Sequence, residues 1–310
     1  MASPAQAQRN AVIQGVCPVV EVPFTPNEEI DYPGFDHMLQ QVLSTGVTAV
    51  MFPGFASEFH KLSVSEQRGL RDRTLRAVAE VDNTRVVIAV HQHATRLAVV
   101  EAASAVEAGA DAINLLPSGF LGPSARAVGE HVSAVLRAVA PTPVILQHAP
   151  REVGSALTVP AIKELAGEHA NLAMVKVESA PAGTFIEALL DEPHPLPSVV
   201  GYAGVQMLDA WRRGAAGVQP GCSMPEIYLD IWHRLDRGDD AGATAVHTRL
   251  LPYLSYFMSE VELMIAAEKY ISVQRGWFDS ERCRAPARLL DKRERDLAEA
   301  LLAEFRDLLT

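Results

Sequence analysis

The chain has 310 residues, of which 48% are hydrophobic and 21% charged, a balance typical of globular proteins. Its formal net charge is −11, and no cluster of lysine and arginine stands out, so we expect no nucleic-acid partner. No apolar run reaches the length of a membrane span, and the first ten residues lack the basic start and apolar core of a signal peptide, so we expect no membrane association.

The first two thirds of the chain alternate between short apolar runs and longer amphipathic stretches. The apolar runs predict strands and the amphipathic stretches predict helices, which together indicate a parallel sheet. In chain order, we expect strand Val16–Val22, helix Tyr32–Ser44, strand Ala49–Phe52, helix Ser65–Glu80, strand Arg85–Val90, helix Arg96–Ala108, strand Ala112–Leu116, helix Ala127–Ala138, strand Val144–Leu146, helix Val159–His169, strand Leu172–Val175, helix Pro181–Leu190, strand Ser198–Gly201, helix Val205–Arg213 and strand Gly217–Gln219.

Several of the predicted helices end in a glycine that is followed by a strand, as at Gly46, Gly109 and Gly214. Glycine adopts the left-handed conformation that commonly ends a helix. Eight strands that alternate with helices in this way indicate an α/β fold of the (β/α)8 TIM-barrel class. A doubly wound open sheet is the alternative, but no GxGxxG follows the first strand.

The alternation stops after Gly221. Three helices are predicted beyond it, at Pro225–Arg237, Ala241–Arg275 and Lys292–Leu309. We therefore expect a C-terminal α-helical appendage, with residues 1–10 as a flexible N-terminus, residues 11–222 as the barrel and residues 223–310 as the helical region.

The three cysteines, Cys17, Cys222 and Cys283, are far apart and show no metal-binding spacing. A sparse, odd number of cysteines is typical of a reducing compartment, so we expect a cytoplasmic protein.

The most informative residue is Lys176, which interrupts the apolar run that begins at Leu172. Burial disfavours the charged form of a lysine, and a neutral amine can attack a ketone and form a Schiff base. Glu178 lies two residues further on, so both side chains leave the strand on the same face. An amine and a carboxylate in this register can divide the nucleophilic and acid/base work.

Further polar residues follow other predicted strands, where the chemistry of eightfold barrels is located. Ser57 and Glu58 follow the second strand; Glu58 could face the substrate or hold its loop. His91 and His93 follow the third strand and share a face, but the sequence fixes no further ligands, so we expect no metal. The remaining candidates are Gln147, His148 as a proton donor or as a wall of the site, and Gly201 as a point of close backbone approach.

From about Gly15 to the C-terminus, the chain resembles the dihydrodipicolinate synthase / N-acetylneuraminate lyase family of class I aldolase-like barrels. The resemblance depends on five motifs, which are, in chain order, Gly54–Glu58, Gly109–Asp111, the segment that contains Pro150 and Gly154, the segment around Lys176, and Gly214–Gly217. The resemblance implies a Schiff-base lysine at Lys176, a small 2-keto acid as substrate, no cofactor, and a homo-oligomer, either a dimer or a tetramer.

Two departures from the family pattern are informative. Gln147 occupies the place of the tyrosine that relays protons in the family, and an amide cannot exchange protons in that way. Phe55 and Ala56 replace the paired hydroxyls that bind the substrate carboxylate, which leaves Ser57 or backbone N–H groups for that role. The phrases around Ser57, Gln147 and Lys176 look most like those of 2-keto-3-deoxy-L-arabonate dehydratase and its relatives.

The sequence therefore predicts a Schiff-base lyase that dehydrates a 2-keto-3-deoxy sugar acid. Lys176 would form the imine, and Glu178 would move the proton at carbon three. The leaving hydroxyl would take its proton from Glu178, a water or one of the three histidines. Two alternatives remain: a pyruvate-releasing class I aldolase of the same family, and a barrel that has lost turnover and binds a metabolite.

Overall fold

The computed structural model describes residues 11–154 and 157–309, which divide into two compact units. The first unit contains residues 11–14, 86–202 and 206–218, and the second contains residues 15–85, 203–205 and 219–309. The N-terminal segment expected to be flexible, residues 1–10, lies outside the described residues.

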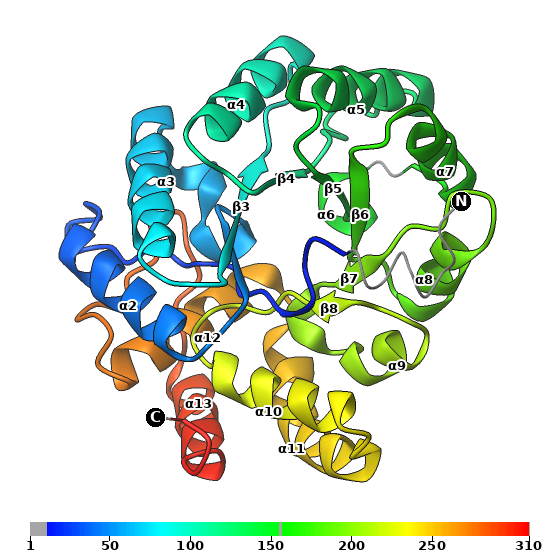
Figure 1. Ribbon diagram of the computed structural model, residues 1–310. Helices are drawn as coiled ribbons and strands as arrows, with labels where there is room; N and C mark the ends of the chain where they lie inside the picture. Colours follow the sequence, from blue (N-terminus) through cyan, green and yellow to red (C-terminus); the bar gives the residue numbers. More distant parts are fainter. Residues whose placement is uncertain (1–10, 155–156, 310) are drawn as a thin grey trace. The chain divides into compact units, whose positions relative to one another are not determined.

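A parallel sheet forms the centre of the first unit. Among its described residues, strands β3 to β8 each pair with the next strand in the chain. Most of the helices that join the strands lie on their outer side (Figure 1). The elements are β3 (Arg85–Val90), α4 (Thr95–Glu107), β4 (Ala112–Leu115), α5 (Ala125–Val139), β5 (Val144–His148), α6 (Pro150–Val153), α7 (Val159–Glu168), β6 (Leu172–Val177), α8 (Gly183–Leu190), β7 (Ser198–Val200), α9 (Met207–Arg212) and β8 (Gly217–Val218).

The register of β5, β6 and β7 positions the polar strand ends. Gln147 lies opposite Lys176, and Lys176 lies opposite Val199. Neighbouring residues of parallel strands point to the same face, so Gln147 and Lys176 share one. The backbone pairing continues one residue past β6, because Glu178 N–H donates to the His148 carbonyl at 2.8 Å.

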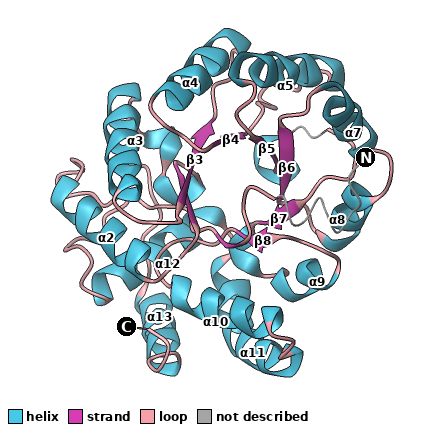
Figure 2. Ribbon diagram, viewed as in Figure 1, coloured by secondary structure: helices cyan, strands magenta, loops and turns pink. Residues whose placement is uncertain are grey.

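The second unit combines the N-terminal part of the chain with the C-terminal helices (Figure 2). The first strand is shorter than the predicted Val16–Val22, because Pro18 cannot donate a ladder hydrogen bond. In the rest of the predicted range, Val19 forms isolated bridges to Met51 and Gly221. The elements are β1 (Gly15–Val16), α2 (Tyr32–Ser44), β2 (Ala49–Phe52), the 3₁₀ turns η1 (Phe55–Ser57) and η2 (Phe59–Lys61), α3 (Val64–Ala79), α10 (Pro225–Asp236), α11 (Asp240–Phe257), α12 (Val261–Gln274) and α13 (Lys292–Glu304).

The single helix predicted over Ala241–Arg275 is wrong. Two helices, α11 and α12, occupy this range, and Glu260 between them has extended backbone angles that no helix allows. The last helix also ends earlier than predicted, at Glu304. In the second unit α10 contacts β1 and α12 contacts η1, so these helices pack on the N-terminal part of the chain, and the boundary proposed at residue 222 stays a prediction.

Eight strands alternate with helices in chain order, and further helices follow the eighth strand. The fold is therefore a (β/α)8 TIM barrel with C-terminal helices, as the sequence predicted. Within the described part of the chain, the structure contains no helix with the length and apolar character needed to cross a membrane.

Candidate active site

Lys176 and Glu178 form an ion pair at the carboxyl end of β6. The distance from Lys176 Nζ to Glu178 Oε1 is 3.3 Å, and the two residues are 3% and 6% exposed. Burial of both groups and their common face are what the sequence predicted. The amine therefore lies beside a carboxylate in a site from which bulk water is largely excluded.

Two amides hold the carboxylate in place. Gln147 Nε2 donates to Glu178 Oε2 at 2.6 Å, and Asn114 Nδ2 in β4 donates to Gln147 Oε1 at 2.8 Å. All three side chains are buried. One carboxylate oxygen thus faces Lys176 while the other is fixed by Gln147, which makes Gln147 a positioning residue for Glu178 and not a proton donor.

Gly201, directly after β7, leaves the space that Glu178 occupies. A Cβ atom at Gly201 would lie 2.4 Å from Glu178 Cγ and 2.5 Å from its Oε1. The close approach expected at this glycine is therefore made to the Glu178 side chain. Its backbone N–H donates to the Val177 carbonyl at 3.0 Å, which continues the strand pairing.

His148 lies on the other face of β5 from Gln147. Its ring stacks on Phe185 of α8, with the ring centroids 4.2 Å apart and the planes at 27°. Burial lowers the pKa of His148, and its buried Nδ1 has no hydrogen-bond partner among the described residues. Adjacent strand residues point to opposite faces, so this placement favours the wall role over the catalytic one.

His91 and His93 follow β3 and differ in environment. His91 is half-buried, whereas His93 is exposed, with its ring 5.8 Å from that of Phe120. Within the part of the chain that is described, no group of three or more His, Cys, Asp or Glu side chains is arranged to hold a metal ion. A substrate contact by either histidine stays a prediction.

Ser57 and Glu58 lie in the second unit, where both are buried in local networks. The Ser57 hydroxyl donates to the Val20 carbonyl and accepts from Gly54 N–H at 2.9 Å, so its donor is used by the backbone. Glu58 pairs with the fully buried Lys269 and accepts from Lys61 Nζ at 3.1 Å. These contacts favour the loop-holding role of Glu58 that the sequence left open.

A second buried carboxylate network lies in the same unit. Glu21 accepts a hydrogen bond from Ser272 and is 1% exposed. Burial, together with the negative charge of Glu268, raises the pKa of Glu21 to about 7. The sequence analysis predicted no role for these residues. A glutamate next to apolar residues, such as Glu21, is more often exposed at the surface than buried.

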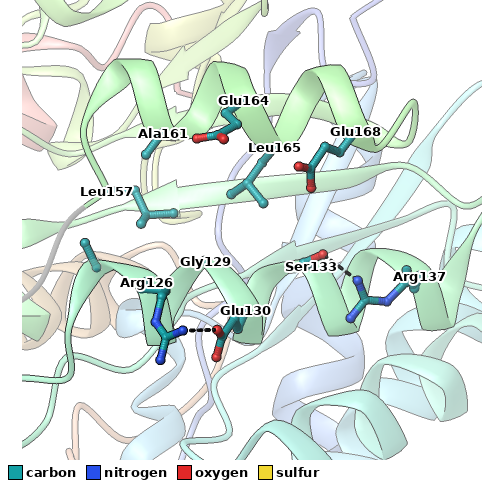
Figure 3. A pocket seen from close by; sticks show the side chains of 11 residues that line it. Arg126, Gly129, Glu130, Ser133, Arg137, Leu157, Ala161, Glu164, Leu165 and Glu168 are labelled. Carbon is teal, nitrogen blue, oxygen red and sulfur yellow. Dashed lines mark hydrogen bonds and ion pairs between the residues drawn. The ribbon is translucent and has the colours of Figure 1, made fainter.

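A groove lies between α5 and α7 in the first unit. It has a volume of about 460 Å³, and its side chains come from the facing sides of the two helices and the loop before α7 (Figure 3). Arg126 and Glu130, an exposed ion pair at 3.6 Å, lie at one end, and Ser133 with Arg137 lies at the other. None of the predicted site residues lines this groove.

Sequence reasoning missed three polar residues of the first unit. Asn114 carries a signal in hindsight, because it is a polar residue inside the apolar strand Ala112–Leu115. Tyr202 and Glu152 carry none: they are 50 positions apart, and only the fold brings the phenol within 2.8 Å of both carboxylate oxygens.

The chain is similar throughout its length to proteins of one family. The sequence profile of the dihydrodipicolinate synthetase family matches residues 12–305. An uncharacterized DapA-like lyase of Halobacterium salinarum is 29% identical over 302 residues, which are 94% of each chain. A 4-hydroxy-tetrahydrodipicolinate synthase of Salinibacter ruber is 24% identical and covers 96% of this chain and 97% of its own.

Solved structures agree with the fold. A putative dihydrodipicolinate synthetase from Pseudomonas aeruginosa superposes with a TM-score of 0.88 at 26% identity, covering 95% of this chain and all of its own. YagE of Escherichia coli K12, a prophage protein of the dihydrodipicolinic acid synthase family solved with pyruvate, has a TM-score of 0.86 at 22% identity over 96% of this chain and 99% of its own.

Proposed function

The chain belongs to the dihydrodipicolinate synthetase family, and from this premise we propose that it is a lyase that forms a Schiff base between Lys176 and a small 2-keto acid. The observation that supports the proposal is the buried pair itself, with Lys176 Nζ 3.3 Å from Glu178 Oε1 on one face of β6. A neighbouring carboxylate can take the proton that an attacking amine must lose.

We further propose that the reaction is the dehydration of a 2-keto-3-deoxy sugar acid. Lys176 attacks the 2-keto carbon, and the ketone oxygen leaves as water. The protonated imine withdraws electrons from carbon three, where Glu178 removes a proton to give the enamine. The hydroxyl on carbon four then leaves, and hydrolysis of the imine frees Lys176. The imine supplies the electron sink, so the reaction as written needs no cofactor.

Gln147 supports the dehydratase over the aldolase. Cleavage of the bond between carbons three and four needs a base for the carbon-four hydroxyl, and the amide that stands at the relay position cannot accept that proton. Gln147 instead holds Glu178, the group that moves the carbon-three proton. The pyruvate-releasing aldolase is the second candidate, because the relatives are named as synthases and lyases of this family.

Product analysis over a panel of 2-keto-3-deoxy acids tests the proposal. We expect an unsaturated or semialdehyde keto acid from the wild-type protein and no product from Lys176→Ala. The matched control is Lys292→Ala, which removes an 85% exposed lysine on α13 and should leave turnover unchanged. Pyruvate plus an aldehyde would identify the aldolase. Full turnover by Lys176→Ala would refute both candidates.

A further inference from the structure

A tyrosine and a glutamate form a close pair beside the Lys176–Glu178 site. The Tyr202 hydroxyl lies 2.8 Å from both carboxylate oxygens of Glu152, and both residues are half-buried. Tyr202 follows Gly201, the residue packed against Glu178, while Glu152 lies on α6 directly after β5. The pair therefore arises from the ends of the strands that flank β6.

The two carboxylates of this region are held differently. Glu178 contacts an ammonium and an amide, both of which donate to a carboxylate. Glu152 is held by a phenol, and burial raises its pKa, as does the negative charge of Glu178, against the hydrogen bond from Tyr202. Two carboxyl groups in unlike environments are the usual arrangement for a base and an acid that work together.

The proposed dehydration needs both functions. One group must take the proton from carbon three, and another must give a proton to the hydroxyl that leaves carbon four. Glu178 fills the first role. Gln147 stands where a relay tyrosine would serve the second, but an amide cannot give up a proton as an acid; it holds Glu178 instead. His148 lies on the opposite face of β5, stacked on Phe185.

We infer that Tyr202 is the proton donor to the leaving hydroxyl and that Glu152 resupplies its proton; this rests on the proposed function. The carbon–oxygen bond at carbon four breaks, its electron pair stays on oxygen, and that oxygen takes the phenolic proton of Tyr202 and leaves as water. When Glu152 is protonated it donates to the Tyr202 oxygen across the same 2.8 Å contact, which frees the phenolic O–H for the leaving hydroxyl, and it then returns a proton to Tyr202. Glu178 releases the carbon-three proton to solvent and Glu152 takes a proton from solvent, which restores both groups.

Tyr202→Phe tests the donor, because it removes only the hydroxyl and keeps the ring. With pyruvate as the probe, we expect unchanged borohydride trapping on Lys176 and unchanged exchange of the carbon-three protons in D₂O, since both need only Lys176 and Glu178. With 2-keto-3-deoxy-L-arabonate and related acids, we expect loss of water to slow by about 10²–10⁴-fold. Glu152→Gln should likewise slow the loss of water while leaving borohydride trapping and proton exchange unchanged.

The matched control is Tyr253→Phe. Tyr253 also donates to a glutamate, Glu304 at 2.7 Å, but it lies on α11 in the second unit, and its loss should change neither readout. Equal slowing of exchange and dehydration in Tyr202→Phe would mean a structural role and would overturn the inference, as would unchanged dehydration. If the wild-type protein exchanged the protons of pyruvate but dehydrated no acid of the panel, the dehydratase function and the proton-donor role of Tyr202 would both be refuted. The formation of an imine on Lys176 would still be supported. A wild-type protein that traps no pyruvate would refute the proposed function itself.

Discussion

Substitution of Gly201 by alanine should move Glu178 and leave Lys176 in place. The added Cβ would lie 2.4 Å from Glu178 Cγ, whereas ordinary contact begins near 3.4 Å, so the carboxylate must shift by about 1 Å. A shift of that size in a catalytic group costs on the order of 10²-fold in rate. The shift also strains the hydrogen bond that Glu178 accepts from Gln147 at 2.6 Å.

The assay is exchange of the carbon-three protons of pyruvate in D₂O, followed by NMR. We expect Gly201→Ala to exchange about 10²-fold more slowly than the wild type, while borohydride still traps pyruvate on Lys176. Gly129→Ala is the matched control, because a Cβ at this glycine of α5 meets no atom within 4 Å. In a helix that change should add about 0.5–1 kcal/mol of stability without altering exchange. Wild-type exchange in a folded Gly201→Ala protein would refute the role assigned to Glu178.

Three further predictions concern the second unit. The pKa of Glu21 is raised to about 7 in the folded protein but is near 4.5 in the unfolded chain, so the free energy of unfolding should fall by about 3 kcal/mol as pH rises from 4.5 to 7. Glu21→Gln should remove this part of the pH dependence. If urea titrations gave the variant the same pH dependence of the unfolding free energy as the wild type, the assignment would be contradicted. Lys269→Met removes the fully buried one of the two lysines that pair with Glu58 and should lower the unfolding free energy by up to about 3–5 kcal/mol, so a loss below about 1 kcal/mol would refute the network. Ser57→Ala should cost about 1–3 kcal/mol of stability, and a selective rise in KM would instead restore its expected substrate contact.

The central pair of the site could be predicted from the sequence. A lysine inside an apolar run and a glutamate two residues later must share a face of one strand, and β6 places them so. The same rule places Gln147 and His148 on opposite faces of β5, because the two residues are adjacent in the strand. A catalytic role for either residue stays a prediction.

The remaining parts of the site depend on contacts between distant segments. The Glu152–Tyr202 hydrogen bond joins the ends of two strands that are not neighbours in the chain, and neither residue stands in a distinctive pattern. The ion pair between Glu58 and Lys269 spans 211 positions. The break between α11 and α12 was missed for a local reason, since residues 258–260 contain neither glycine nor proline.

Covalent capture of pyruvate tests the central claim most directly. The protein is incubated with pyruvate, reduced with borohydride, weighed intact and digested for peptide mapping. The account predicts one adduct per chain, located on Lys176 and absent from Lys176→Ala. An unmodified protein, or an adduct located on a different lysine, would contradict it.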